Sequence, residues 1–159
     1  MKKLVPITAV MGWAFYVLSL FLPAVYEPGV GRVFSGMEAL FLSGLLLLMT
    51  IQHSIDTLLA QGPTVFLVSV AMCLSNLVMW ATPRPLLSKR RVSGRIFPAL
   101  MLVLSVLNSI GPWALSEPGD LYVGYYMWTG SFWLVTAALY LMRVVSAPRN
   151  RGGASREAV

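Results

Sequence analysis

Five uncharged, mostly apolar stretches divide this chain, and almost all of its cationic residues lie between or after them. The stretches are 4–26, 39–55, 57–83, 96–116 and 121–142. A helix rises about 1.5 Å per residue, so about 20 apolar residues cross a hydrocarbon core roughly 30 Å thick. Four stretches are long enough. This predicts an all-α integral membrane protein, a bundle of four transmembrane helices plus one re-entrant or spanning helix over 36–60.

The composition agrees with this class. Only 11% of the residues are charged, against about a quarter in ordinary soluble domains. A chain of 159 residues is one small domain. We expect a single membrane domain over 1–146 and a disordered basic tail over 147–159, which is polar and contains glycine.

The net charge of +6 is distributed as in a membrane protein rather than a nucleic-acid-binding one. Five cations fall in the gap 84–95, and four more follow the last stretch, at 143–156. Lys and Arg beside membrane spans mark the cytoplasmic side and favour anionic lipid headgroups. The expected partner is therefore the lipid bilayer, not nucleic acid.

Two topologies satisfy this charge rule. If all five stretches cross with the amino terminus outside, 10 of the 12 Lys and Arg residues lie inside. If four cross and the second stretch enters and leaves the same face, both termini are inside and only Arg32 lies outside. In both topologies the gap 84–95 and the tail are cytoplasmic, whereas the segment 117–120 is external. Aromatic residues on both sides of that segment fit an interfacial belt: Trp113, Tyr122, Tyr125, Tyr126 and Trp128.

The second stretch opens with Ser35-Gly36-Met37-Glu38, a capping box in which the serine and glutamate bond to each other's backbone N–H groups. We expect the helix to run to about Ala60, before Gly62-Pro63. Small residues recur in it every seven positions, at Gly36, Ser43, Thr50 and Thr57. Such a stripe lets membrane helices approach closely, so we interpret it as a packing face. A face lining a solute path is the alternative.

Polar residues inside the other stretches could likewise form contacts between packed helices or line a solute path. Asn76 lies in the third stretch, and Asn108 lies in the fourth together with Ser105. Neither asparagine titrates, so a proton relay would have no carrier there. We therefore predict that both form hydrogen bonds between packed helices.

His53 and Asp56 are three residues apart on one helix, and they give the one hint of site chemistry. A metal pair or an acid–base dyad is conceivable at this spacing. One histidine and one cysteine do not make a usual zinc site, so we interpret the pair as the polar end of a helix. The sequence predicts no catalytic residue, no metal and no cofactor.

Four segments resemble a family of small bacterial inner-membrane proteins of unknown function. They are SLFLPA at 19–24, GMEAL at 36–40, Asn76 ahead of the basic gap, and LYVGYYMW at 121–128. The resemblance implies four spans with both termini in the cytoplasm, which favours a re-entrant second stretch. It implies no activity.

Two function classes remain open. The first is a non-enzymatic accessory, regulatory or immunity-type membrane component that acts on another membrane protein. The second is a small channel or transporter subunit that acts as an oligomer of this chain. Few ionisable residues in the spans and little loop mass favour the first.

Overall fold

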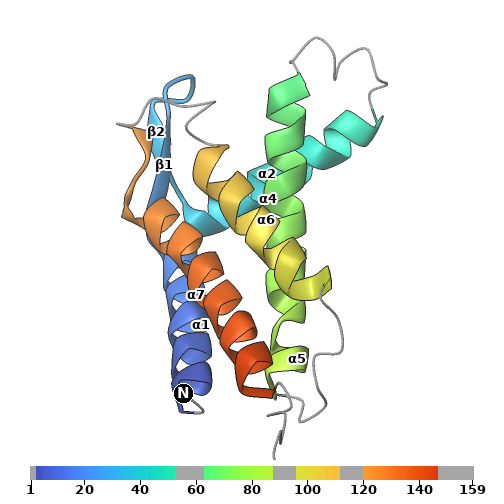
Figure 1. The fold of residues 1–159 in the computed structure, drawn as a ribbon. Coiled ribbons are helices and arrows are strands. Elements are labelled where there is room, and N and C mark those ends of the chain that lie inside the picture. Colours follow the sequence, from blue (N-terminus) through green and yellow to red (C-terminus); the bar gives the residue numbers. More distant parts are fainter. Residues whose placement is uncertain (1–2, 53–62, 88–95, 112–119, 147–159) are drawn as a thin grey trace, which may run out of the picture.

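The computed structural model describes residues 3–52, 63–87, 96–111 and 120–146, which form a mostly helical protein (Figure 1). Its helices and strands are α1 (Leu4–Phe21), β1 (Pro23–Glu27), β2 (Arg32–Ser35), α2 (Gly36–Gln52), α4 (Pro63–Ala81), α5 (Pro83–Leu87), α6 (Ile96–Ile110) and α7 (Val123–Ser146). The prediction of a helical protein is confirmed. The hairpin of β1 and β2 was not predicted.

The first apolar stretch is helical only as far as Phe21. Leu22 is extended, with φ −90° and ψ 154°. It precedes Pro23, and a proline ring disfavours helical backbone in the residue before it. The end of the stretch, residues 23–27, therefore forms β1 instead of a last helical turn.

β1 and β2 pair antiparallel, with Glu27 opposite Arg32. The turn between them uses Gly31, whose φ of 68° lies in the left-handed region that suits glycine. The Gly31 N–H donates to the Glu27 carbonyl at 2.8 Å. On its other side, β1 is fixed to the start of α7, because Val25 bridges to Leu121.

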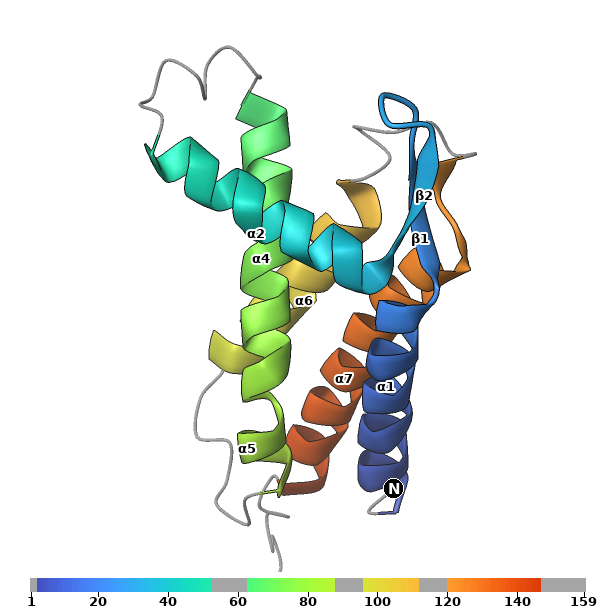
Figure 2. The same ribbon diagram turned by 180° about the vertical axis from the view of Figure 1, so that it is seen from behind.

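α1 packs mainly against α7, and the two helices lie side by side (Figures 1 and 2). Gly12 makes this close approach possible, because a β-carbon there would lie 2.7 Å from Cγ2 of Val135. Gly124 at the start of α7 lets the segment after α1 approach, because a β-carbon there would lie 2.5 Å from the Pro23 carbonyl oxygen. A side chain at either position would push these segments apart.

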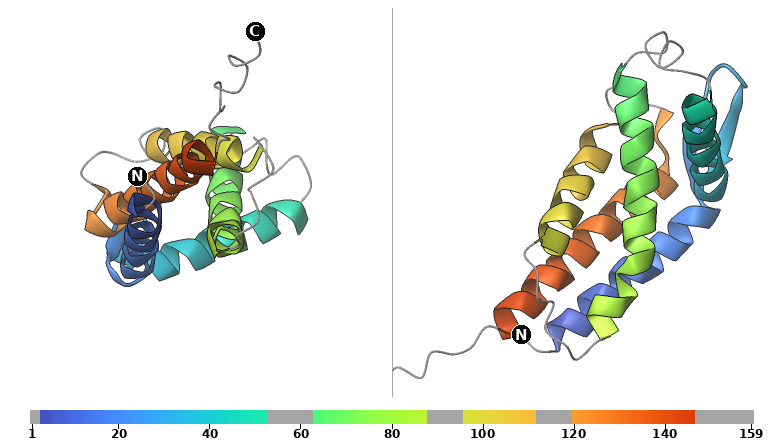
Figure 3. Two further views of the ribbon diagram at one scale, coloured as in Figure 1. Left: turned by 60° about the horizontal axis from the view of Figure 1, so that its bottom comes forward. Right: turned by 90° about the vertical axis from the view of Figure 1, so that its right-hand side faces the viewer.

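α2 begins directly after the hairpin and is held against the end of α1. The Gly36 N–H donates to the Leu22 carbonyl at 3.1 Å, and a β-carbon at Gly36 would overlap the Ser19 carbonyl oxygen. From there α2 crosses α4 steeply (Figure 2), and the right-hand view of Figure 3 shows it nearly end-on beside an upright α4. The predicted helix end near Ala60 lies outside the described residues.

The other elements define two ends of the molecule (Figure 1). The start of α1, the end of α7 and the short α5 lie at one end, and the hairpin lies toward the opposite end. Neither terminus of α2 reaches the end that carries the amino terminus (Figure 2). Of the described charged residues, Lys3, Arg84 and Arg143 belong to the first end, whereas Arg32 and Glu38 belong to the hairpin end.

Within the described residues, two helices are long and apolar enough to cross a membrane, Leu4–Phe21 and Val123–Val145. Two further apolar helices, Val70–Ala81 and Ile96–Ile110, are shorter. The coarse prediction of apolar helices is thus confirmed for the first and last stretches. Four spans remain a proposal.

Candidate functional site

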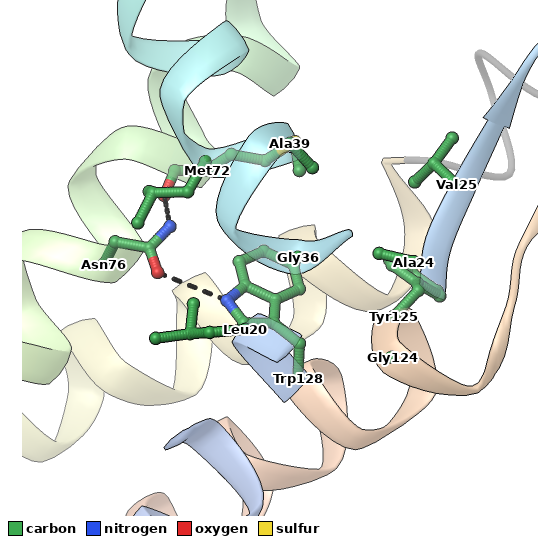
Figure 4. A pocket seen from close by; sticks show the side chains of 11 residues that line it. Leu20, Ala24, Val25, Gly36, Ala39, Met72, Asn76, Gly124, Tyr125 and Trp128 are labelled. Carbon is green, nitrogen blue, oxygen red and sulfur yellow. Dashed lines mark hydrogen bonds between the residues drawn. The ribbon is translucent and has the colours of Figure 1, made fainter. Parts of the chain in front are cut away.

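Asn76 of α4 lies at the centre of a hydrogen-bond network in the interior and is only 7% exposed. Its Oδ1 accepts from the Tyr16 hydroxyl at 2.9 Å and from Nε1 of Trp128 at 3.2 Å. Its Nδ2 donates to the Met72 carbonyl at 2.8 Å. Figure 4 shows the bonds to Met72 and Trp128. One carboxamide therefore joins α1, α4 and α7.

Aromatic side chains make the remaining connections between α1 and α4. Nε1 of Trp80 donates to the Tyr16 hydroxyl at 3.1 Å, and Nε1 of Trp13 donates to Oγ1 of Thr82 at 3.1 Å. The rings of Trp13 and Tyr16 meet edge to face, with centroids 5.5 Å apart. The two helices are thus joined through long side chains.

Asn108 of α6 is a second connection and is almost completely buried. Its Nδ2 donates to Oγ of Ser75 on α4 at 2.8 Å. Its backbone carbonyl accepts from the Tyr125 hydroxyl of α7 at 2.6 Å. One turn earlier, Oγ of Ser105 lies 3.1 Å from Oγ1 of Thr136. Both asparagines singled out from the sequence therefore bond between helices.

An open groove of about 540 Å³ lies between α2 and α4. Its lining is Leu40, Phe41, Gly44, Leu45, Leu48, Cys73, Asn76, Leu77 and Trp80. Leu40 and Asn76 also line a smaller cavity of about 30 Å³, which α1, β1, α2, α4 and α7 enclose (Figure 4). That space suffices for about one water molecule. The groove is large enough for a ligand.

The small residues predicted as a packing stripe have different surroundings. Gly36 contacts the end of α1 closely, as a packing face requires. Gly44, beside the stripe, would have no atom within 4 Å of a β-carbon and lines the groove. The side chains of Ser43 and Thr50 and the whole of Thr57 lie outside what the structure describes, so their packing role stays a prediction.

His53 and Asp56 also lie outside the described residues, and their interpretation as a polar helix end stays a prediction. Among the residues that are described, no group of three or more His, Cys, Asp or Glu side chains could hold a metal ion. The described part of the chain therefore offers a hydrogen-bonded interior and an apolar groove, and no metal-ligand cluster.

The predicted capping box at the start of α2 is confirmed. The Ser35 N–H donates to Oε2 of Glu38 at 2.9 Å, and the Glu38 N–H donates to Oγ of Ser35 at 3.3 Å. Arg32 pairs with Oε1 of Glu38 at 2.9 Å. The hydrogen bonds from Ser35, helped by the Arg32 charge, hold the pKa of Glu38 below its usual value.

The prediction of an interfacial aromatic belt is only partly correct. Tyr122 and Tyr126 are exposed, but Tyr125 and Trp128 are buried and hydrogen-bonded inside the molecule. The spacing along α7 could have revealed this, because its large buried residues recur three and four positions apart. They are Tyr125, Trp128, Phe132, Val135 and Leu139. Trp113 lies outside the described residues.

The polar network, the groove and the hairpin are the features from which a function has to be argued. No family model, no curated protein and no solved structure matches this chain.

Proposed function

We propose that this protein is a multi-pass protein of the bacterial inner membrane with four spans, formed by α1, α4, α6 and α7. The support is its exposed apolar surface. Ile7, Val10 and Phe21 of α1 are 55–70% exposed, and the leucines and valines on the outer side of α6 are 37–54% exposed. Soluble monomers rarely expose contiguous apolar patches beyond a few hundred Å². Lipid is the solvent that suits such helices.

In this proposal α2 is re-entrant on the external side. Two observations support this arrangement over five parallel spans. α2 is inclined to α4, and both termini of α2 lie away from the end that carries the amino terminus. Lys3, Arg84 and Arg143 then belong to the cytoplasmic end, together with the basic gap 84–95. Both termini are cytoplasmic.

Within that membrane we propose a non-enzymatic accessory, regulatory or immunity-type component that acts through contact with another membrane protein. The observation that carries this is the use of Asn76, Asn108, Ser105 and Thr136 in bonds between helices of the same chain. These groups are amides and hydroxyls, and none of them gains or loses a proton near neutral pH. Their geometry supports a rigid bundle better than a solute path.

Co-purification from mild detergent tests this function. A stoichiometric second membrane protein is the expected result, with the complex stable through size exclusion. A defined homo-oligomer with no foreign partner would contradict it and favour the channel or transporter subunit instead. Crosslinking in intact cells before extraction controls for association formed in detergent.

A further inference from the structure

We propose that the groove between α2 and α4 binds one acyl chain of a membrane lipid. This rests on the membrane location proposed above, and it adds a specific ligand at the groove. Three features support it: the chemistry of the lining, its shape around Gly44, and the surface to which the groove opens.

The lining accepts a neutral, apolar ligand. No charged side chain is among the described residues that line the groove. Its polar members are Asn76 and Cys73, and the Asn76 oxygen already accepts from Tyr16 and Trp128. A charged or strongly polar ligand would lose its hydration here without gaining partners. A hydrocarbon chain has no polar groups, so it gives up no hydrogen bonds to water when it enters the groove.

Gly44 shapes the groove. A glycine inside a helix is unfavourable relative to alanine, because it has more conformational freedom to lose on folding. At Gly12 and Gly124 the missing side chain allows close contact within the chain, because a β-carbon there would lie under 3 Å from neighbouring atoms. At Gly44 a β-carbon would have no neighbour within 4 Å among the described residues. The missing side chain therefore enlarges the groove instead of allowing a close contact with another described element.

The space at Gly44 is narrow along the helix. Leu40 and Leu48, four residues before and after Gly44, also line the groove, as does Phe41. Close docking of a second membrane helix uses small residues spaced four apart, and here both such positions are leucine. Leucine at both positions disfavours close approach of a second helix backbone, whereas a flexible polymethylene chain can enter the space at Gly44.

The groove opens where hydrocarbon would be present. Phe41, Leu77 and Trp80 at its edge are 65–71% exposed. A chain lying along them would cover the side of Asn76 that faces the groove. It would thereby cover, on that side, the network that joins α1, α4 and α7.

The test uses the full chain, purified from the membrane fraction in mild detergent and incubated with palmitoyl-oleoyl phosphatidylethanolamine. Native mass spectrometry should show one retained phospholipid on the wild type. Gly44→Leu should lose it, because the new side chain fills the slot without a clash in the fold. Ala137→Leu, at an exposed position of α7 away from the groove, adds a similar bulk and should retain it.

Cys73 supplies a second measurement, because it is the one cysteine of the chain and lines the groove. Added phospholipid should slow alkylation of the wild type by N-ethylmaleimide and should leave the rate of Gly44→Leu unchanged. Equal lipid retention by wild type and Gly44→Leu would overturn the proposal, as would a wild type without lipid. Retention lost equally in Ala137→Leu would also overturn it. A chain recovered only from the soluble fraction would refute the membrane location itself.

Discussion

The indole nitrogen of Trp128 donates to the carboxamide oxygen of Asn76 across 3.2 Å, joining residues 52 positions apart in the sequence. The same oxygen accepts from the Tyr16 hydroxyl. These groups are buried, and in the proposed membrane location no water competes for them, so each partner depends on the others for its hydrogen bond. Asn76 thereby determines how α1 and α7 sit against α4.

Asn76→Leu should destabilise the bundle because it removes the acceptor of two buried donors. Hydrogen bonds in membrane proteins average about 0.6 kcal/mol, and a buried group left without a partner costs about 1–3 kcal/mol. We therefore expect the free energy of unfolding to fall by about 1–3 kcal/mol. Thermal unfolding in detergent measures this change. Leu77→Ala, at the neighbouring exposed position, is the control and should change stability little. Equal effects of the two would refute a special role for Asn76.

Two glycines of α2 should respond oppositely to alanine. Gly36→Ala puts a β-carbon into the Ser19 carbonyl, and such overpacking costs typically about 1–3 kcal/mol. Gly44→Ala meets nothing within 4 Å and should stabilise the helix by about 0.5–1 kcal/mol. Unfolding temperatures of the two variants, measured side by side, check this. Destabilisation by Gly44→Ala would mean that α2 packs differently.

Glu38 should make the stability of the fold at the hairpin end decrease at low pH. Its folded pKa is lowered by Ser35 and Arg32, so its ionised form stabilises the fold above the unfolded pKa of about 4.3. This stabilisation is lost as the pH falls through the lower, folded pKa. The unfolding temperature of the wild type should therefore exceed that of Glu38→Gln at pH 7, and the difference should shrink below about pH 4. A difference independent of pH would contradict it.

Reporter fusions test the orientation. Fusions after Arg91 and Arg156 should be cytoplasmic, and a fusion after Gly119 should be external, because cations flank the cytoplasmic ends of spans. A fusion after Lys3 should be cytoplasmic if α2 is re-entrant. An external signal there would favour five spans. An external signal after Arg91 would exclude both topologies.

Short sequence motifs predicted the structure correctly where the interacting groups are close together in the sequence. The capping box over 35–38 requires only two side chains and two N–H groups within one turn, and it is present as predicted. Asn76 and Asn108 were singled out because amides are unfavourable in hydrocarbon without partners. Their partners on other helices, which lie 17–60 residues away, could not be read from that argument.

The hairpin and the burial of Trp128 show where such signals fail. Residues 23–26 continue the uncharged run of the helix before them, so the pattern predicts one span despite the proline at its break. Trp128 is amphipathic, so composition places it equally well at an interface or in a hydrogen-bonded interior. Helix packing decides between these two environments, and it depends on the whole bundle.

The pairing of α1 with α7 has a consequence for how the chain is made. α7 begins at Val123, about a hundred residues after α1 ends at Phe21. Ribosomes add about 5–20 residues per second, so the first helix waits roughly 5–20 s for the face that covers Gly12. In the membrane location proposed above, lipid or an insertion factor would cover the glycine face during that interval. Synthesis of the last helix then releases that occupant and closes the bundle.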